Sequence, residues 1–103
     1  MECRGVVAQY DTVGDAFRIW TSTQTPHNTQ RAVVDMFNMP EDKVRIITPD
    51  VGGGFGPKFL FYSEEIVVAL SARLCGRPVK WIEDRREHFV AAVQERDQYW
   101  EAE

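Results

Sequence analysis

Glycines gather in one short segment of the sequence, where residues 51–58 read VGGGFGPK. Four glycines within five positions are incompatible with a regular helix or strand interior, so we predict a loop. The segment does not match a dinucleotide-binding or a Walker A motif, because Pro57 precedes and Phe59 follows Lys58. Bare backbone instead lets a ligand approach closely, with N–H groups free to bind oxygen or sulfur acceptors. A tight turn needed only for packing is the alternative interpretation.

A second candidate segment, residues 22–27, reads STQTPH and lies at the predicted junction between a strand and a helix. Such junctions present side chains at the carboxyl edge of a sheet, where α/β folds bind ligands. Gln24 carries a neutral amide that both donates and accepts hydrogen bonds, which suits an oxo group or a carbonyl. The alternative is that Gln24 is an ordinary surface or capping residue. We expect His27 to be an ordinary residue of the first helical turn.

Three strands are expected to position these two segments. Residues 5–10 and 17–23 are predicted to form a hairpin around the turn at residues 11–15, in which Gly14 is available for a positive φ. Residues 43–50 contain a short β-branched run and are predicted to form a strand that leads directly into the glycine loop.

Two main helices are predicted. The first spans residues 26–37, with Thr25 as N-cap and Asn38 closing it in the left-handed conformation. The second begins after a capping Ser63 and ends at Gly76. Their apolar periodicity predicts the buried positions, which are Thr29, Ala32, Val33, Met36 and Phe37 in the first helix, and Ile66, Val67, Ala69, Leu70 and Leu74, with Val68 and Ala72 beside them, in the second.

The C-terminal part is predicted to contain a strand at residues 79–83, with Val79 and Trp81 on one face, and a turn or short helix at residues 84–88. Residues 89–100 are predicted to form a last strand, although residues 92–96 also tolerate a helix. The whole is an α/β (α+β) fold, a mixed sheet in β-β-α-β-α-β order with two main helices, in a single domain of residues 1–103.

Composition excludes several classes of function. The net charge of −4 arises entirely from residues 83–103, and no basic face suggests nucleic-acid binding. No apolar run approaches the roughly 20 residues that span a membrane, and the absence of a signal peptide predicts a cytoplasmic location with two reduced thiols. Cys3 and Cys75 lack zinc-site spacing with the two histidines, and Cys75 is expected to be buried and inert.

Four ordered segments resemble a known family. Residues 22–27 and 44–58, taken with the opening MECRGVVA and with residues 76–89, are similar to the molybdenum-binding large subunits of the xanthine dehydrogenase and aldehyde oxidase family. Within that family the nearest likeness is to the aerobic carbon monoxide dehydrogenase type. Because the resemblance covers residues 1–96, the chain is predicted to be an internal segment of the molybdopterin-binding region of such a subunit.

The resemblance implies a molybdenum–molybdopterin oxidoreductase that oxidises an aldehyde, an N-heterocycle or a carbon monoxide-like substrate with water as oxygen source. In the family, the glutamine matching Gln24 hydrogen-bonds an oxo ligand of molybdenum, and the loop matching Gly53, Gly54, Phe55 and Gly56 contacts the molybdenum ligands and the pterin. No residue here is expected to ligate molybdenum directly. The family's catalytic glutamate is expected in a segment that this chain does not contain, so we expect the isolated chain to be inactive and to hold no cofactor.

The resemblance also implies partners, which are the remainder of the large subunit, iron–sulfur and flavin subunits or domains, and a small-molecule substrate. Phe59 replaces the substrate-orienting glutamate of xanthine-oxidising members, which argues against a purine substrate, while Pro57 replaces a glycine and Cys3 a proline. Exposed apolar surface around Phe59, Leu60 and Phe61 is predicted to let the chain self-associate. The alternative function is a stand-alone domain that binds a ligand or protein without redox chemistry.

Overall fold

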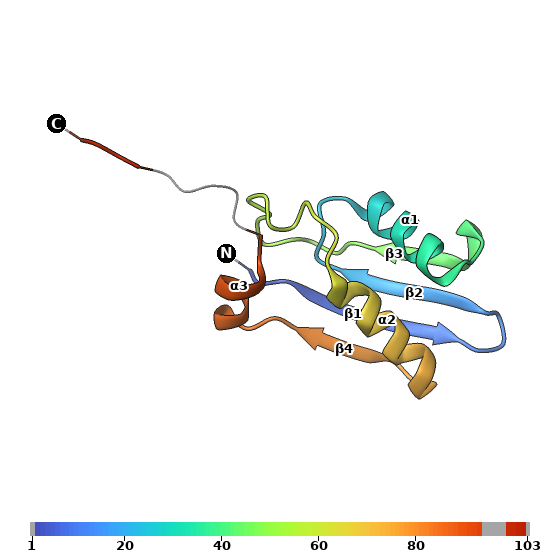
Figure 1. The fold of residues 1–103 in the computed structure, drawn as a ribbon. Helices are drawn as coiled ribbons and strands as arrows, with labels where there is room; N and C mark the ends of the chain where they lie inside the picture. Colours follow the sequence, from blue (N-terminus) through green and yellow to red (C-terminus); the bar gives the residue numbers. More distant parts are fainter. Residues whose placement is uncertain (1, 94–98, 103) are drawn as a thin grey trace.

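A computed structural model describes residues 2–93 and 99–102 and shows a four-stranded mixed sheet with its two longer helices on one face (Figure 1). The strand order is β3-β2-β1-β4, and the predicted fold class and element order are confirmed. The elements are β1 (Gly5–Asp11), β2 (Ala16–Thr21), α1 (Pro26–Phe37), the 3-10 turn η1 (Glu41–Lys43), β3 (Val44–Ile47), α2 (Ser63–Cys75), β4 (Val79–Ile82) and α3 (Arg85–Ala91).

The core lies between the sheet and the helices α1 and α2. Alternate residues of each strand point toward these helices, as the pleat of a strand requires. In β4 the half-buried Val79 and Trp81 face the core and Ile82 faces away, as predicted. The buried apolar residues come from three strands, two helices and the turn after α1, and they are Val6, Ala8, Phe17, Ile19, Val33, Met39, Val44, Val68, Ala69 and Ala72.

The predicted hairpin is confirmed, with β1 and β2 antiparallel and Val6 opposite Thr21. The expectation for its turn was wrong in one detail, because Asp15 rather than Gly14 has the positive φ, of 47°. The Asp11 carboxylate accepts a hydrogen bond from the Val13 N–H at 3.0 Å, which fixes a local turn. An aspartate tolerates the left-handed conformation well enough to close it.

The pairing of β3 with β2 is parallel, which places the ends of both strands at the same edge of the sheet. The strand β4 pairs antiparallel with β1, so the sheet is mixed. Helix α1 connects β2 to β3, and the loop of residues 48–62 connects β3 to α2. Both connections that carry the candidate residues therefore begin at this one edge (Figure 1).

Helix α1 has the predicted bounds and ends at Asn38, whose φ of 50° is left-handed as expected. Thr25 occupies the N-cap position, but its hydroxyl makes no capping hydrogen bond. The predicted buried stripe was wrong at Met36, which is 64% exposed. The buried face centres on Thr29 and Val33, four residues apart, and Met39 from the following turn fills the core instead.

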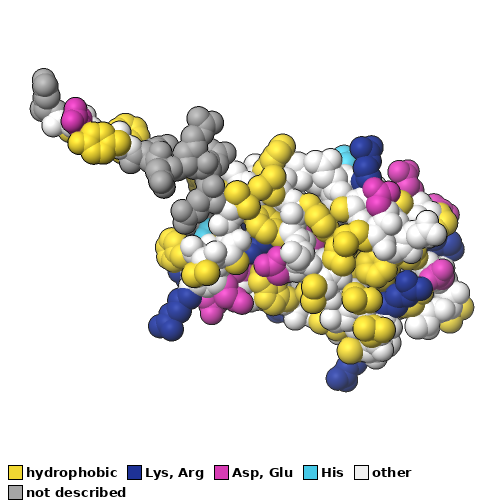
Figure 2. Space-filling view, in the orientation of Figure 1, with side chains coloured by type: hydrophobic (Ala, Val, Ile, Leu, Met, Phe, Trp, Pro, Cys, Tyr) yellow, Lys and Arg dark blue, Asp and Glu magenta, His cyan; other side chains and the backbone are white. Residues whose placement is uncertain are grey.

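Helix α2 begins at Ser63 and follows Tyr62 at the cap position, so the prediction of Ser63 as the cap was wrong. Its interior face was also partly mispredicted, because Val67, Leu70 and Leu74 are exposed. The helix is apolar around much of its circumference, so periodicity could not fix its rotation. Figure 2 shows apolar side chains at the surface on the helix-bearing face. The buried residues of α2 are Glu65, Val68, Ala69 and Ala72.

The segment after β4 forms the short helix α3, which confirms the prediction for residues 84–88. The Asp84 carboxylate accepts hydrogen bonds from the N–H groups of Arg86 and Glu87, which caps this helix. The strand expected from residue 89 was wrong at residues 89–91, which are helical, and residues 94–98 of that expectation lie outside the described residues. Within the described part of the chain, no helix has the length and apolar character to cross a membrane.

Candidate functional site

The glycine loop keeps an unusual backbone between β3 and α2. Gly53, Phe55 and Gly56 have φ values of 86°, 49° and 91°, which lie in the region that side chains rarely adopt. A Cβ on Gly53 would also lie 2.3 Å from the ring of Phe55, so only glycine fits there. Phe55 itself is 76% exposed, so its ring is available as a wall against a ligand.

The tip of the loop presents unpaired donors. The backbone N–H groups of Gly54, Phe55 and Gly56 have no hydrogen-bond partner among residues 2–93 and 99–102. Backbone N–H groups without a protein partner can donate to anions or electron-rich atoms of a ligand. The loop therefore has the bare, donor-rich backbone that the sequence predicted.

Gln24 lies directly against this loop. Its backbone N–H donates to the carbonyl of Lys58 at 2.8 Å, and its side-chain amide is so close to Gly54 that a Cβ there would lie 2.3 Å from Gln24 Cδ. The residue is exposed, so the amide faces both the loop and solvent. The structure thus brings together the two segments that the sequence marked as candidates.

Two threonines fix the β2–α1 connection beside Gln24. The Thr23 hydroxyl accepts the Thr25 N–H at 3.1 Å and donates to the Lys58 carbonyl at 3.3 Å. The Thr25 hydroxyl donates to the Phe59 carbonyl at 2.8 Å, which explains why it does not cap α1. These bonds join the end of β2 to the end of the glycine loop, so Gln24 has a defined backbone position.

The buried carboxyl group of Glu65 contacts the end of β2 and the start of α2, next to the same junction. Glu65 of α2 accepts a hydrogen bond from the Thr21 hydroxyl at 2.8 Å and from the Tyr62 N–H at 3.1 Å. Burial raises the pKa of Glu65, while the hydrogen bonds from Thr21 and Tyr62 oppose that rise. Sequence periodicity missed Glu65, because an acidic residue in the first helical turn is typical of an exposed position.

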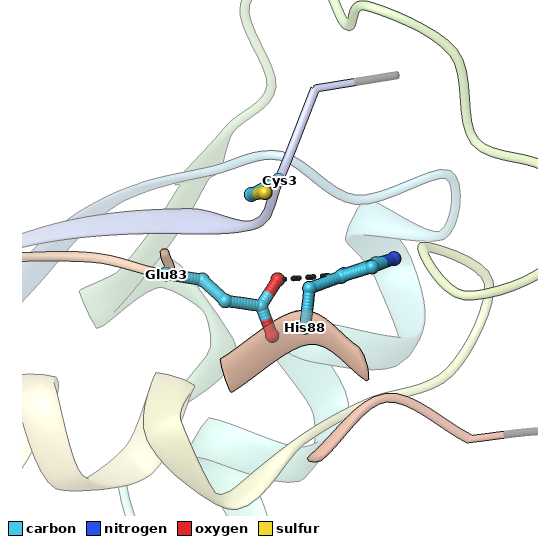
Figure 3. Close-up of side chains that lie close together, drawn as sticks. All are labelled: Cys3, Glu83 and His88. Carbon is cyan, nitrogen blue, oxygen red and sulfur yellow. Dashed lines mark hydrogen bonds and ion pairs between the residues drawn. The ribbon is translucent and has the colours of Figure 1, made fainter. Parts of the chain in front are cut away.

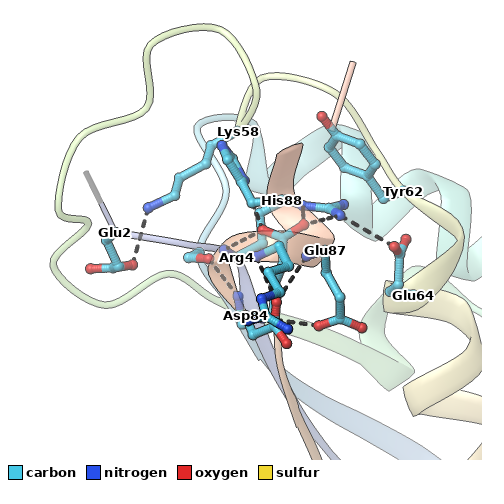
Figure 4. Close-up of polar contacts among 12 residues, drawn as sticks. Glu2, Arg4, Lys58, Tyr62, Glu64, Asp84, Glu87 and His88 are labelled. Atoms are coloured by element: carbon cyan, nitrogen blue, oxygen red, sulfur yellow. Dashed lines mark hydrogen bonds and ion pairs between the residues drawn. The ribbon is translucent and has the colours of Figure 1, made fainter. Parts of the chain in front are cut away.

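A second polar cluster surrounds Arg4, which is only 5% exposed (Figure 4). Its guanidinium donates to Glu83 Oε1 from Nε at 3.0 Å and from Nη2 at 2.6 Å, and lies 3.6 Å from the centroid of the Tyr62 ring. The other oxygen of Glu83 accepts the Arg4 N–H and faces His88 Nδ1, each at 2.9 Å. Burial alone would raise the pKa of Glu83, but the hydrogen bonds from Arg4 and His88 lower it to about 2.

Cys3 lies beside this cluster, and one ligand atom from each of Cys3, Glu83 and His88 lies within 4.8 Å of the others (Figure 3). These residue types can bind zinc. However, both oxygens of Glu83 are already engaged by Arg4, whose positive charge opposes a cation at the same carboxylate. We therefore assign the cluster to stability. Cys3 and Cys75 are both free thiols, and the prediction that Cys75 is buried was wrong, because it is exposed.

Comparison with known proteins identifies the class. Residues 1–103 match the family of molybdopterin cofactor-binding domains, and the chain belongs to that family. The family resemblance predicted from the sequence is thereby confirmed. The expectation that the full-length proteins containing such a domain use molybdenum–molybdopterin is also confirmed.

The similar proteins are large subunits of molybdenum enzymes. The chain is 37% identical over 96% of its length to the nicotine 6-hydroxylase large subunit of Paenarthrobacter nicotinovorans, of which it covers 12%. It is 36% identical over its whole length to the carbon monoxide dehydrogenase large chain of Hydrogenophaga pseudoflava, of which it covers 13%. The crystal structure of quinoline 2-oxidoreductase from Pseudomonas putida 86 superposes on 89% of the chain, with a TM-score of 0.87 and 46% identity, and 12% of that protein is covered.

Proposed function

We propose that residues 1–103 form a single domain that contributes part of the cofactor site of a molybdopterin-dependent oxidoreductase. The observation that carries the proposal is the contact between the Gln24 amide and Gly54, at a loop tip where three N–H groups have no partner among the described residues. Family membership supports the identity of the cofactor. The chain spans only about an eighth of its relatives, so the activity is proposed for an enzyme that contains this chain.

The residues present fit such a cofactor. The N–H groups of Gly54, Phe55 and Gly56 would donate to its oxygen or sulfur atoms, and the absence of a side chain at Gly54 lets the Gln24 amide lie directly beside these donors. The amide of Gln24 would donate to an oxo group beside them. Bound molybdopterin would supply the redox chemistry, with water as the oxygen source. No residue of this domain is proposed as a direct metal ligand or as the catalytic base, which we assign to another segment of the large subunit.

The proposed substrate is an aldehyde, an N-heterocycle or a carbon monoxide-like molecule. The names of the similar proteins, which include a nicotine 6-hydroxylase, a quinoline 2-oxidoreductase and carbon monoxide dehydrogenases, support this range. Phe59 is 57% exposed beyond the loop and offers an apolar surface rather than the carboxylate that a purine site would use. This observation favours a substrate without purine-like polar groups.

We further propose that the remainder of the large subunit and iron–sulfur and flavin subunits or domains are the partners. Apolar side chains on two faces support this. Val67, Leu70 and Leu74 are exposed on α2, and Ile82 is 59% exposed beside half-buried Trp20 on the opposite face of the sheet. The cytoplasmic location stays a prediction from the sequence.

Gln24→Ala in the molybdenum enzyme that contains this chain tests the proposal. Removing one preorganised donor from a group that gains charge in a reaction lowers turnover by about 10²–10³-fold, and we expect a loss of this size at unchanged molybdenum content. Gln9→Ala is the matched control, because Gln9 is an exposed glutamine of β1 far from the loop. Unchanged turnover of the Gln24→Ala enzyme at full cofactor loading would refute the role of Gln24.

A further inference from the structure

Lys58, at the end of the glycine loop, is buried to an unusual degree. It is only 2% exposed and is one of the largest fully buried side chains of the chain. Its ammonium group lies 3.1 Å from Glu2 Oε1, in the segment that precedes β1 (Figure 4). Withdrawing an ammonium from water is costly unless a carboxylate compensates it, so this pair acts as one unit.

Glu2 also holds the other end of the loop. Its second carboxylate oxygen accepts the N–H of Gly52 at 2.9 Å, and its own N–H donates to the carbonyl of Gly52 at 3.2 Å. A Cβ on Gly52 would lie 2.8 Å from the Cβ of Glu2, so this close approach requires glycine at position 52. Hydrogen bonds from Lys58 and from the Gly52 backbone lower the pKa of Glu2, which shows that both contacts favour its ionised carboxylate.

The same lysine connects the loop to Gln24. The carbonyl of Lys58 accepts the Gln24 N–H at 2.8 Å, and the N–H of Lys58 donates to the Gly54 carbonyl at 3.5 Å. The side chain of Lys58 is therefore fixed by Glu2, while its backbone contacts Gln24 and Gly54 of the proposed site. Displacement of this lysine would move the Gln24 backbone and the Gly54 carbonyl together.

We propose that Glu2 and Lys58 are positioning residues that form a clasp across residues 52–58 and hold the glycine loop against Gln24. The clasp links three segments that are distant in sequence, namely the N-terminal segment, the β2–α1 connection and the loop. Its bearing on the cofactor rests on the function proposed above. Its effect on the loop does not, so the two proposals are tested separately.

Residue-resolved amide exchange of the 103-residue chain by NMR tests the clasp. The variants are Glu2→Ala, Lys58→Met and the double variant. Glu41→Ala is the matched control, because Glu41 is an exposed glutamate for which the structure shows no side-chain partner among the described residues. Lys58→Met keeps an unbranched chain in the buried site, so it reports on the clasp if Glu2→Ala does not fold.

We expect the amides of Gly52 and Gln24 to exchange about tenfold faster in both single variants, because each variant removes one side chain of the Glu2–Lys58 pair that fixes the two ends of the loop. The double variant is expected to be no faster than the faster single variant, since both remove the same interaction. Amides of the β1–β2 ladder, such as Ala8, and the control are expected to exchange as in the wild type.

Three results would overturn the clasp. The first is an exchange rate at Gly52 and Gln24 within about twofold of the wild type in the single variants, and the second is an equal acceleration of exchange at Ala8. The third is an acceleration in the double variant equal to the product of the accelerations in the two single variants. Cofactor retention in the molybdenum enzyme is the separate readout. If the loop loosens in Lys58→Met while the molybdopterin content and turnover of that enzyme are unchanged, the clasp stands and the proposed cofactor contact fails.

Discussion

Gly54→Ala separates the geometry of the candidate site from the stability of the fold. A Cβ at position 54 would lie 2.3 Å from Cδ, 2.5 Å from Oε1 and 2.7 Å from Nε2 of Gln24, so the amide must move. The φ of Gly54 is outside the left-handed region, so alanine brings no backbone strain there. Because Gln24 is exposed, its side chain can turn into solvent. We therefore expect a loss of unfolding free energy below about 1 kcal/mol, typical of a surface change.

Gly76→Ala is the matched control for a glycine-to-alanine change. Gly76 has a φ of 61° and open space around its Cα, so alanine there adds backbone strain and no collision. The left-handed conformation costs about 1–2 kcal/mol for alanine. At about 4–8 °C per kcal/mol for a domain near this size, thermal unfolding is expected to shift downward clearly in Gly76→Ala and only slightly in Gly54→Ala.

For turnover, Gly54→Ala should be the more damaging of the two variants, whereas for stability it should be the less damaging. Turnover of the molybdenum enzyme is expected to fall about 10²-fold in Gly54→Ala, because the Gln24 amide is displaced, and to stay at the wild-type value in Gly76→Ala. Calorimetry and steady-state kinetics at equal molybdenum content measure the two effects. Wild-type turnover in Gly54→Ala would refute the reasoning, and so would a larger loss of stability in Gly54→Ala than in Gly76→Ala.

Two further predictions concern stability and association. Arg4→Met should lower the free energy of unfolding in urea by about 3 kcal/mol or more, because it leaves the Glu83 carboxylate buried without its cation. The control Arg18→Met, at an exposed position, should leave the free energy of unfolding nearly unchanged. The pKa of Glu83 is lowered from 4.5 to about 2, so the wild type should lose this stabilisation as the pH falls from about 4.5 toward 2. If the free energy of unfolding of Arg4→Met fell equally over this pH range, the role of the Arg4–Glu83 pair would be contradicted. Phe59→Ser should weaken the self-association of the chain measured by sedimentation velocity. The control Val13→Ser should not weaken it, although Val13 is 96% exposed. Equal effects of the two substitutions would exclude the surface at Phe59 as the contact between copies.

The sequence predicted best what local chemistry determines. The bounds of α1 are confirmed because Pro26 fits the first helical turn and Asn38 closes the helix in the left-handed conformation. The glycine loop and the hairpin were likewise predictable, since glycine density and turn residues act within a few positions. The family resemblance added the cofactor, which composition and periodicity alone did not indicate.

What the sequence did not predict depends on contacts between distant segments. In α2, Glu65 lies on the buried face because Thr21 of β2 supplies a hydroxyl for its carboxylate. Arg4 pairs with Glu83, 79 positions later in the sequence, and with Glu64, and each of these residue types alone is typical of the surface. No periodic pattern marks such pairs, because a buried charge depends on its partner rather than on its neighbours in sequence.

Among residues 2–93 and 99–102, the N–H groups of residues 54–56 have no hydrogen-bond partner, whereas both ends of the same loop are hydrogen-bonded. On one side Gly52 is held by Glu2, and on the other Lys58 is held by Glu2 and by the backbone of Gln24. Phe55 and Gly56 are exposed and Gly54 is half-buried, so water can satisfy these donors until a ligand replaces it. Fixed ends and a donor-rich tip suit a binding loop. Because the loop is already ordered when the chain folds, its conformational entropy is not lost again when the ligand binds. On this reasoning the donors of residues 54–56 serve the ligand, the glycine at position 54 makes room for the Gln24 amide, and the glycine at position 52 serves the clasp.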